Sequence, residues 1–95
     1  MYFLKISGYI PEKKHLEFKQ SLDEIHEQIK EDCHEFTITR DLNEKDIYYL
    51  HIHWNTKDAY QTFLNSQDYR VLYSSFHVLG KILDISSGNL SDIAN

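Results

Sequence analysis

Two pairs of side chains have the residue types and the spacing to do chemistry. His51 and His53 lie two residues apart in an alternating stretch, so a strand would point both imidazoles to one face, toward one metal or one substrate. Tyr73 and His77 lie four apart, so a helix would place them side by side. A tyrosine beside a histidine can orient a phenolic substrate or accept its proton. We take Tyr73 and His77 as candidate catalytic residues and His51 and His53 as candidate substrate contacts.

Both pairs also have a purely structural interpretation. Histidines on a strand are often found on half-buried or interface faces, and aromatic side chains at helical spacing usually belong to a core. Two histidines are too few to define a zinc or iron site, because a third ligand such as His34 or Asp84 would have to lie near them. We therefore expect no metal.

Other polar residues carry weaker signals. Ser7 and Tyr9 share one face of a predicted strand and could line a pocket between a sheet and its helices, or simply face solvent. Cys33 follows Glu31 and Asp32, whose negative charges oppose formation of a thiolate, so we expect no nucleophilic role. The sequence contains no glycine-rich phosphate loop, no nucleophile elbow and no CxxC pair.

Composition limits the classes of partner. Ninety-five residues make one small domain, for which a second subunit would add useful stability. Fifteen acidic against 10 basic residues, with no basic cluster longer than Lys13-Lys14, argue against nucleic acid and anionic membranes. The sequence has a single cysteine, no signal peptide and no apolar run long enough to span a bilayer. We expect a homodimer in the cytoplasm.

Hydrophobic periodicity supplies the elements that would position these residues. An alternating pattern predicts strands, and apolar residues at helical spacing predict helices. Gly8 would mark a bulge or a close approach, and Gly80 would end a helix in a left-handed conformation. The predicted strands cover Tyr2–Ile10, Glu35–Arg40, Tyr48–Trp54 and Ile82–Ile85, and the predicted helices cover Lys13–Glu31, Lys57–Leu64 and Asp68–Leu79.

This order is the ferredoxin-like βαββαβ plan with its second helix split in two. We expect one domain over residues 1–88 and a frayed tail over residues 89–95. Helices on one face of the sheet would leave the other face open and suited to pairing with a second copy. If the more apolar residues meet the helices, the open face holds Thr37, Thr39, Tyr49, His51 and His53.

A strand that ends in Trp54, followed by a short helix through Ala59 and Phe63 and then by Ser66 and Tyr69, carries a resemblance to a known family. In this respect the chain resembles the antibiotic-biosynthesis-monooxygenase-like family. The resemblance implies a ferredoxin-like chain that pairs sheet to sheet as a dimeric α+β barrel. The family includes cofactor-free oxygenases of aromatic polyketides and quinols, haem-degrading enzymes and small isomerases.

The haem-degrading branch uses an asparagine, a tryptophan and a histidine at positions that correspond to Ser7, Phe63 and Tyr73, so the resemblance disfavours haem degradation here. It implies instead a cofactor-independent monooxygenase of a small aromatic or quinol-like molecule. Its substrate would contact Ser7, Tyr9, His51, His53 and Phe63. The alternative is a homodimeric ligand-binding or interaction module that keeps the fold without the chemistry.

Overall fold

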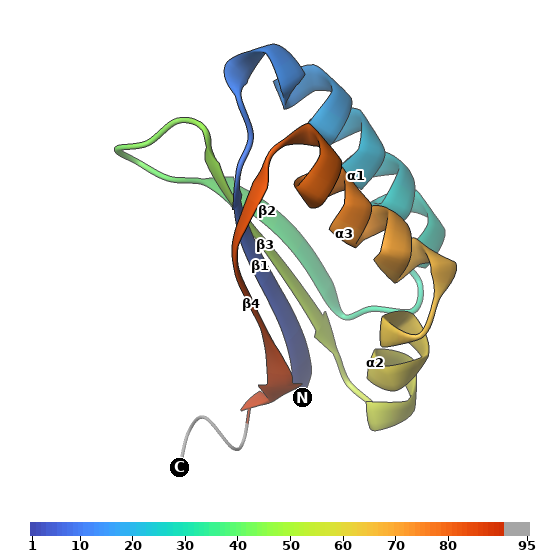
Figure 1. Cartoon of the computed structure of the whole chain (residues 1–95). Coiled ribbons are helices and arrows are strands. Elements are labelled where there is room, and N and C mark those ends of the chain that lie inside the picture. The colour runs from blue at the N-terminus through green and yellow to red at the C-terminus, as the bar shows by residue number, and fades with distance from the viewer. Residues whose placement is uncertain (91–95) are drawn as a thin grey trace.

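The structure, a computed structural model, describes residues 1–90. Figure 1 shows a sheet covered on one face by helices, with the other face left open. The elements in chain order are β1 (Tyr2–Tyr9), a 3₁₀ turn (Glu12–Lys14), α1 (His15–Ile29), β2 (Glu35–Arg40), β3 (Ile47–Trp54), α2 (Lys57–Leu64), α3 (Gln67–Leu79) and β4 (Lys81–Asn89). In this described part of the chain, no helix has the length and apolar character needed to cross a membrane.

The sheet has the strand order β2-β3-β1-β4, and every neighbouring pair is antiparallel. β1 and β3 are therefore the central strands, and Leu4 lies opposite Ile52 between them. This topology, with helices on one face, is the ferredoxin-like arrangement that the sequence predicted.

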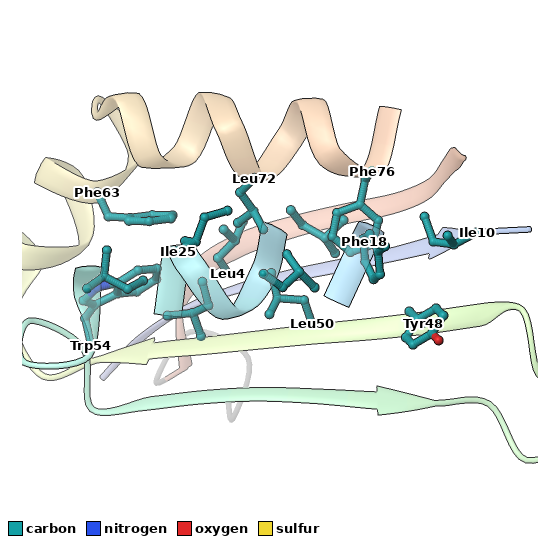
Figure 2. Close-up of a cluster of buried hydrophobic side chains, with 14 residues drawn as sticks. Leu4, Ile10, Phe18, Ile25, Tyr48, Leu50, Trp54, Phe63, Leu72 and Phe76 are labelled. Atoms are coloured by element: carbon teal, nitrogen blue, oxygen red, sulfur yellow. The ribbon is translucent and has the colours of Figure 1, made fainter. Parts of the chain in front are cut away.

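The core lies between the sheet and the helices and is filled by large side chains (Figure 2). Phe18 of α1 contacts Phe76 of α3 and Tyr48 of β3, with ring centroids 4.8 and 5.1 Å apart. At the other end of the core, Trp54 is only 1 % exposed and packs against Phe63 of α2 at 5.1 Å. Trp54 therefore belongs to the core at this end of the sheet.

Side-chain caps divide the second helical segment in two. Thr56 Oγ1 accepts a hydrogen bond from the backbone N–H of Ala59 at 3.2 Å and begins α2. Ser66 Oγ accepts one from the N–H of Tyr69 at 3.2 Å and begins α3, while its hydroxyl donates to the carbonyl of Phe63 at 2.6 Å. The predicted break between the two helices is therefore fixed by the hydrogen bonds of Ser66.

Two glycines allow the backbone to pass close to other parts of the core. A Cβ atom on Gly8 would lie 2.5 Å from Cδ1 of Phe76, and the register against β4 shifts at this residue, so the predicted close approach and bulge are both present. Gly80 was predicted to be left-handed, and this is wrong, because its φ is −162°. Glycine is required there because a Cβ would overlap the carbonyl oxygen of Tyr9.

The last strand is longer than predicted. β4 continues to Asn89, because Ser86 and Ser87 pair with Lys5 and Leu4 of β1. This polar run lacks the alternation that marks a half-buried strand, so the pattern ended the prediction at Ile85. The final five residues of the predicted tail lie outside the described residues.

Candidate functional site

The sheet face that points away from the helices is called the open sheet face here. Residues opposite one another in an antiparallel pair point to the same side, so the register fixes its members. They include the five residues that the sequence placed there, together with Lys5 and with Ser7 and Tyr9, which were expected elsewhere. The full set is Lys5, Ser7, Tyr9, Thr37, Thr39, Tyr49, His51 and His53.

Ser7 and Tyr9 do not lie between the sheet and the helices. Ser7 sits on the open sheet face between Tyr49 and Asp84, and Tyr9 is 43 % exposed. The sequence placed these two residues on one strand face correctly. Their expected position in a pocket beneath the helices is wrong, because Leu4 and Ile6 of the same strand fill the sheet face that meets the helices.

The two histidines have different electrostatic surroundings. Nδ1 of His53 lies 3.1 Å from Oε2 of Glu35 on β2. His51 lies opposite Lys5 on β1 and Thr37 on β2. Partial burial lowers the pKa of His51 most, the positive charges of Lys5 and His53 lower it further, and Glu35 opposes the change.

The candidate catalytic residues lie on the other layer of the molecule. The rings of Tyr73 and His77 stack on α3 with centroids 6.0 Å apart, so their predicted adjacency is present. Tyr73 is 42 % exposed and faces outward. The sheet separates this pair from His51 and His53, so the predicted site residues do not meet at one point.

A chain of aromatic contacts connects the end of β3 with α3. Phe63 packs between Trp54 and Tyr69, at 5.1 and 5.8 Å, and Tyr60 stands 5.6 Å from Trp54. The pKa of Tyr69 is raised, chiefly by burial and also by the nearby phenols of Tyr73 and Tyr60. Tyr69 therefore stays protonated and can donate a hydrogen bond over the neutral pH range.

A hollow of about 330 Å³ opens beside this chain of rings, between the C-terminal end of α1, α2 and the start of α3. Its base is formed by buried apolar residues and its rim by exposed or half-buried polar ones. We call it the acidic hollow, because three aspartates line it. It is lined by Ile29, Asp32, Trp54, Asp58, Ala59, Thr62, Phe63, Ser66 and Asp68.

Of the predicted substrate contacts, Phe63 alone lines this hollow. The sequence contained no direct signal for the other residues that line the hollow. Asp32 lies 26 residues before Asp58, and the two meet only when α1 packs beside α2. Asp58 and Asp68 had a simpler explanation, since acidic residues stabilise the first turn of a helix.

The positions that correspond to the haem-degrading constellation are not brought together. Ser7 points away from the helix layer that contains Phe63 and Tyr73, so the three positions do not surround one space. Among the described residues, the histidine, cysteine and carboxylate side chains form no group of three or more that could hold a metal ion.

The sequence matches the model of the family described as antibiotic biosynthesis monooxygenase over residues 1–73. No curated protein matches it significantly. The matched region contains α1, α2, the start of α3 and both central strands, and hence every residue of the acidic hollow.

Many solved structures share the fold. One, from Deinococcus radiodurans and named after the same family, has a TM-score of 0.77 and 16 % identity and aligns over 94 % of this chain and 91 % of its own. A conserved protein from Methanosarcina mazei has a TM-score of 0.78 and 12 % identity, and aligns over 93 % of this chain and 90 % of its own. A Bacteroides thetaiotaomicron protein described as an oxidoreductase candidate has a TM-score of 0.76 and 8 % identity, and aligns over 92 % of this chain and 94 % of its own. At these identities the likeness concerns the fold alone.

Proposed function

Because the chain belongs to the antibiotic biosynthesis monooxygenase family, we propose that it is a cofactor-independent oxygenase of a small aromatic or quinol-like molecule. The observation that carries the proposal is the acidic hollow, whose base of Trp54 and Phe63 lies within the matched region. Both rings are almost fully buried, so a flat aromatic ligand would contact only the small part of them that lines the hollow. A volume of about 330 Å³ suits a molecule of one or two rings.

The rim of the hollow suits the hydroxyl groups of such a molecule. Carboxylates accept hydrogen bonds, so Asp32, Asp58 and Asp68 can each bind a phenolic O–H. The same three negative charges disfavour a ligand that arrives as an anion. We therefore expect a neutral hydroquinone or phenol to bind, and its proton must be accepted by a group within the site, so that the site does not become more negative.

The reaction needs no external reductant. A phenol that is oxidised to a quinone by one O₂ gains one oxygen atom on the ring, and the second oxygen leaves as water with the two hydrogens that the ring carbon and hydroxyl lose. O₂ reacts readily once the substrate is an electron-rich anion, so the protein must chiefly hold the ring and take a proton. For proton transfer we propose Tyr73 and His77, whose helix begins at the rim of the hollow.

Oxygen consumption with a panel of substituted hydroquinones tests this function. We expect turnover by the unaltered protein, a loss of at least tenfold in kcat/KM when Thr62→Trp fills the hollow, and a smaller fall in kcat for Tyr73→Phe and His77→Ala. Gln61→Trp, also exposed on α2 but not lining the hollow, is the matched control. No turnover above the spontaneous rate, or turnover unaffected by Thr62→Trp, would refute the proposal.

The quaternary structure in this proposal is a homodimer that pairs the open sheet faces. Proteins of this fold are typically dimeric. The open sheet face carries aromatic side chains and charges of both signs, which suits the pairing of two identical surfaces. These residues are Phe3, Lys5, Glu35, Tyr49 and Asp84. Light scattering at micromolar concentration should give the mass of two chains, and a single-chain mass would exclude this assembly.

A non-catalytic ligand-binding module is the second candidate. The outward position of Tyr73, at 42 % exposure, favours it, because a proton acceptor usually points into the site it serves. Such a module would bind hydroquinones in the acidic hollow without consuming oxygen. Calorimetric titration that shows binding lost in Thr62→Trp, together with no oxygen uptake, would select this function.

A further inference from the structure

We propose that His51 makes the pairing of two open sheet faces sensitive to pH, so that its protonation drives the two copies apart. The inference rests on the homodimer proposed above. His51 lies among fixed charges, so we expect the dimer to be favoured at neutral pH and weakened by mild acid.

The register places His51 away from both sheet edges. Its strand, β3, runs between β1 and β2, and its opposite neighbours are Lys5 on one side and Thr37 on the other. Along its own strand, Tyr49 and His53 point to the same face. The charged and titratable groups that act on the imidazole are therefore Lys5, His53 and Glu35.

The balance of these groups opposes a positive charge on His51. Lys5 is a cation in the directly opposite position, whereas the carboxylate of Glu35 lies opposite His53 and 3.1 Å from its Nδ1. Burial and the charge of Lys5 already lower the pKa of His51 in the single chain. A second copy laid over this face would remove water, which weakens the solvation of a charged imidazole and strengthens its repulsion from Lys5.

Proton linkage gives the direction of the effect. If the pKa of His51 is lower in the dimer than in the free chain, the free chain binds more protons, and lowering the pH favours dissociation. The two symmetry-related imidazoles contribute together. The dissociation constant then rises by up to about 100-fold per pH unit in the range between the two pKa values.

His53 provides a matched control on the same strand face. Its protonation places a positive charge beside the carboxylate of Glu35, so the new charge is compensated within one chain. Replacing His53 should therefore leave the pH dependence largely intact, although both histidines lie on the same face of β3 and both are half-buried.

The test is the dimer dissociation constant from dilution series by sedimentation velocity at pH 7.5, 6.5 and 5.5, with circular dichroism to follow the fold. We expect a rise of at least tenfold from pH 7.5 to 5.5 for the unaltered protein and for His53→Gln, and less than threefold for His51→Gln. At pH 7.5, His51→Lys mimics the protonated state and should weaken the dimer at least tenfold, and more than His53→Lys.

The outcomes separate the inference from the assembly on which it rests. A single chain at every pH would refute the homodimer itself. A dimer whose affinity is independent of pH, a pH dependence retained in His51→Gln, or a dimer unaffected by His51→Lys at pH 7.5 would overturn the role of His51 and leave the homodimer standing.

Discussion

The hydroxyl of Tyr49 donates a hydrogen bond of 2.7 Å to Oδ1 of Asp41. The other oxygen of this carboxylate accepts hydrogen bonds from the backbone N–H groups of Asn43 and Glu44, each at 3.0 Å. One side chain therefore closes the turn between β2 and β3 and also holds it against the open sheet face. Asp41 therefore organises this turn through its hydrogen bonds to Asn43, Glu44 and Tyr49.

These bonds predict a contribution to acid stability. The hydroxyl of Tyr49 and then the two backbone N–H groups lower the pKa of Asp41 below its ordinary 3.8. The folded chain therefore binds fewer protons than the unfolded one, so the stabilisation is full above pH 3.8 and is lost as the pH falls through the folded value. Urea titrations from pH 5 to 2 should show a shallower loss of stability in Asp41→Asn, and an unchanged loss in the exposed control Asp23→Asn.

Tyr48 places a hydroxyl inside the core. The residue is 1 % exposed, and among the described residues no group is hydrogen-bonded to its buried oxygen. Because such a hydroxyl contributes little, Tyr48→Phe should leave the free energy of unfolding unchanged or raise it by up to about 1 kcal/mol. Tyr48→Ala should lower it by about 3–5 kcal/mol, since it empties the space beside Phe18. A large loss in Tyr48→Phe, measured by urea denaturation, would show that the hydroxyl is stabilising.

Gly8 should tolerate no side chain while Phe76 occupies its present position. Gly8→Ala places a Cβ 2.5 Å from the Phe76 ring and 3.1 Å from the carbonyl oxygen of Lys81, which predicts a loss of about 1–3 kcal/mol. Thermal denaturation of Gly8→Ala, Phe76→Leu and the double variant forms a cycle. The double variant should be more stable than the sum of the single losses predicts. Simple additivity would contradict the contact.

The cap at Ser66 should matter more than the cap at Thr56. Ser66→Ala removes the acceptor of the Tyr69 N–H and also the donor to the Phe63 carbonyl, with an expected loss of about 1–2 kcal/mol. Thr56→Ala removes the acceptor of the Ala59 N–H and should lose about 1 kcal/mol. Equal losses in chemical denaturation would indicate that the bond to Phe63 contributes nothing.

Cys33 should react slowly with alkylating agents. Burial raises the pKa of its thiol above the ordinary 9.0, and the charge of Asp32 adds to this, although a hydrogen bond from its own backbone N–H opposes them. Less thiolate is then present in the folded chain, so iodoacetamide at pH 7.5 should modify it several-fold more slowly than in urea-unfolded chain. Equal rates, followed by mass spectrometry, would contradict this assignment.

Sequence periodicity predicted most of the fold, because the buried faces are continuous. The alternation from Tyr48 to Trp54 and the helical spacing of Phe18 and Leu22 in α1 each correspond to a face that meets the core. Prediction failed where pairing depends on a distant strand, as in the polar end of β4, or on a close backbone approach, as at Gly80.

The candidate site was harder to predict, because its parts come from separate elements. The stacking of Tyr73 and His77 follows from their spacing within one helix. The acidic hollow needs the end of α1 to pack beside α2, which no local pattern records. The side of the sheet on which Ser7 lies likewise became clear only with the register.

The central position of β1 also bears on how the chain folds during synthesis. Its partners are β3, about 45 residues later, and β4, at the end of the described chain. The sheet cannot be completed until residues 1–89 have left the ribosome, and until then β1 exposes an unpaired edge to other nascent chains. With its main pairings so far apart in sequence, the domain should fold in milliseconds to seconds, more slowly than helical bundles of similar size.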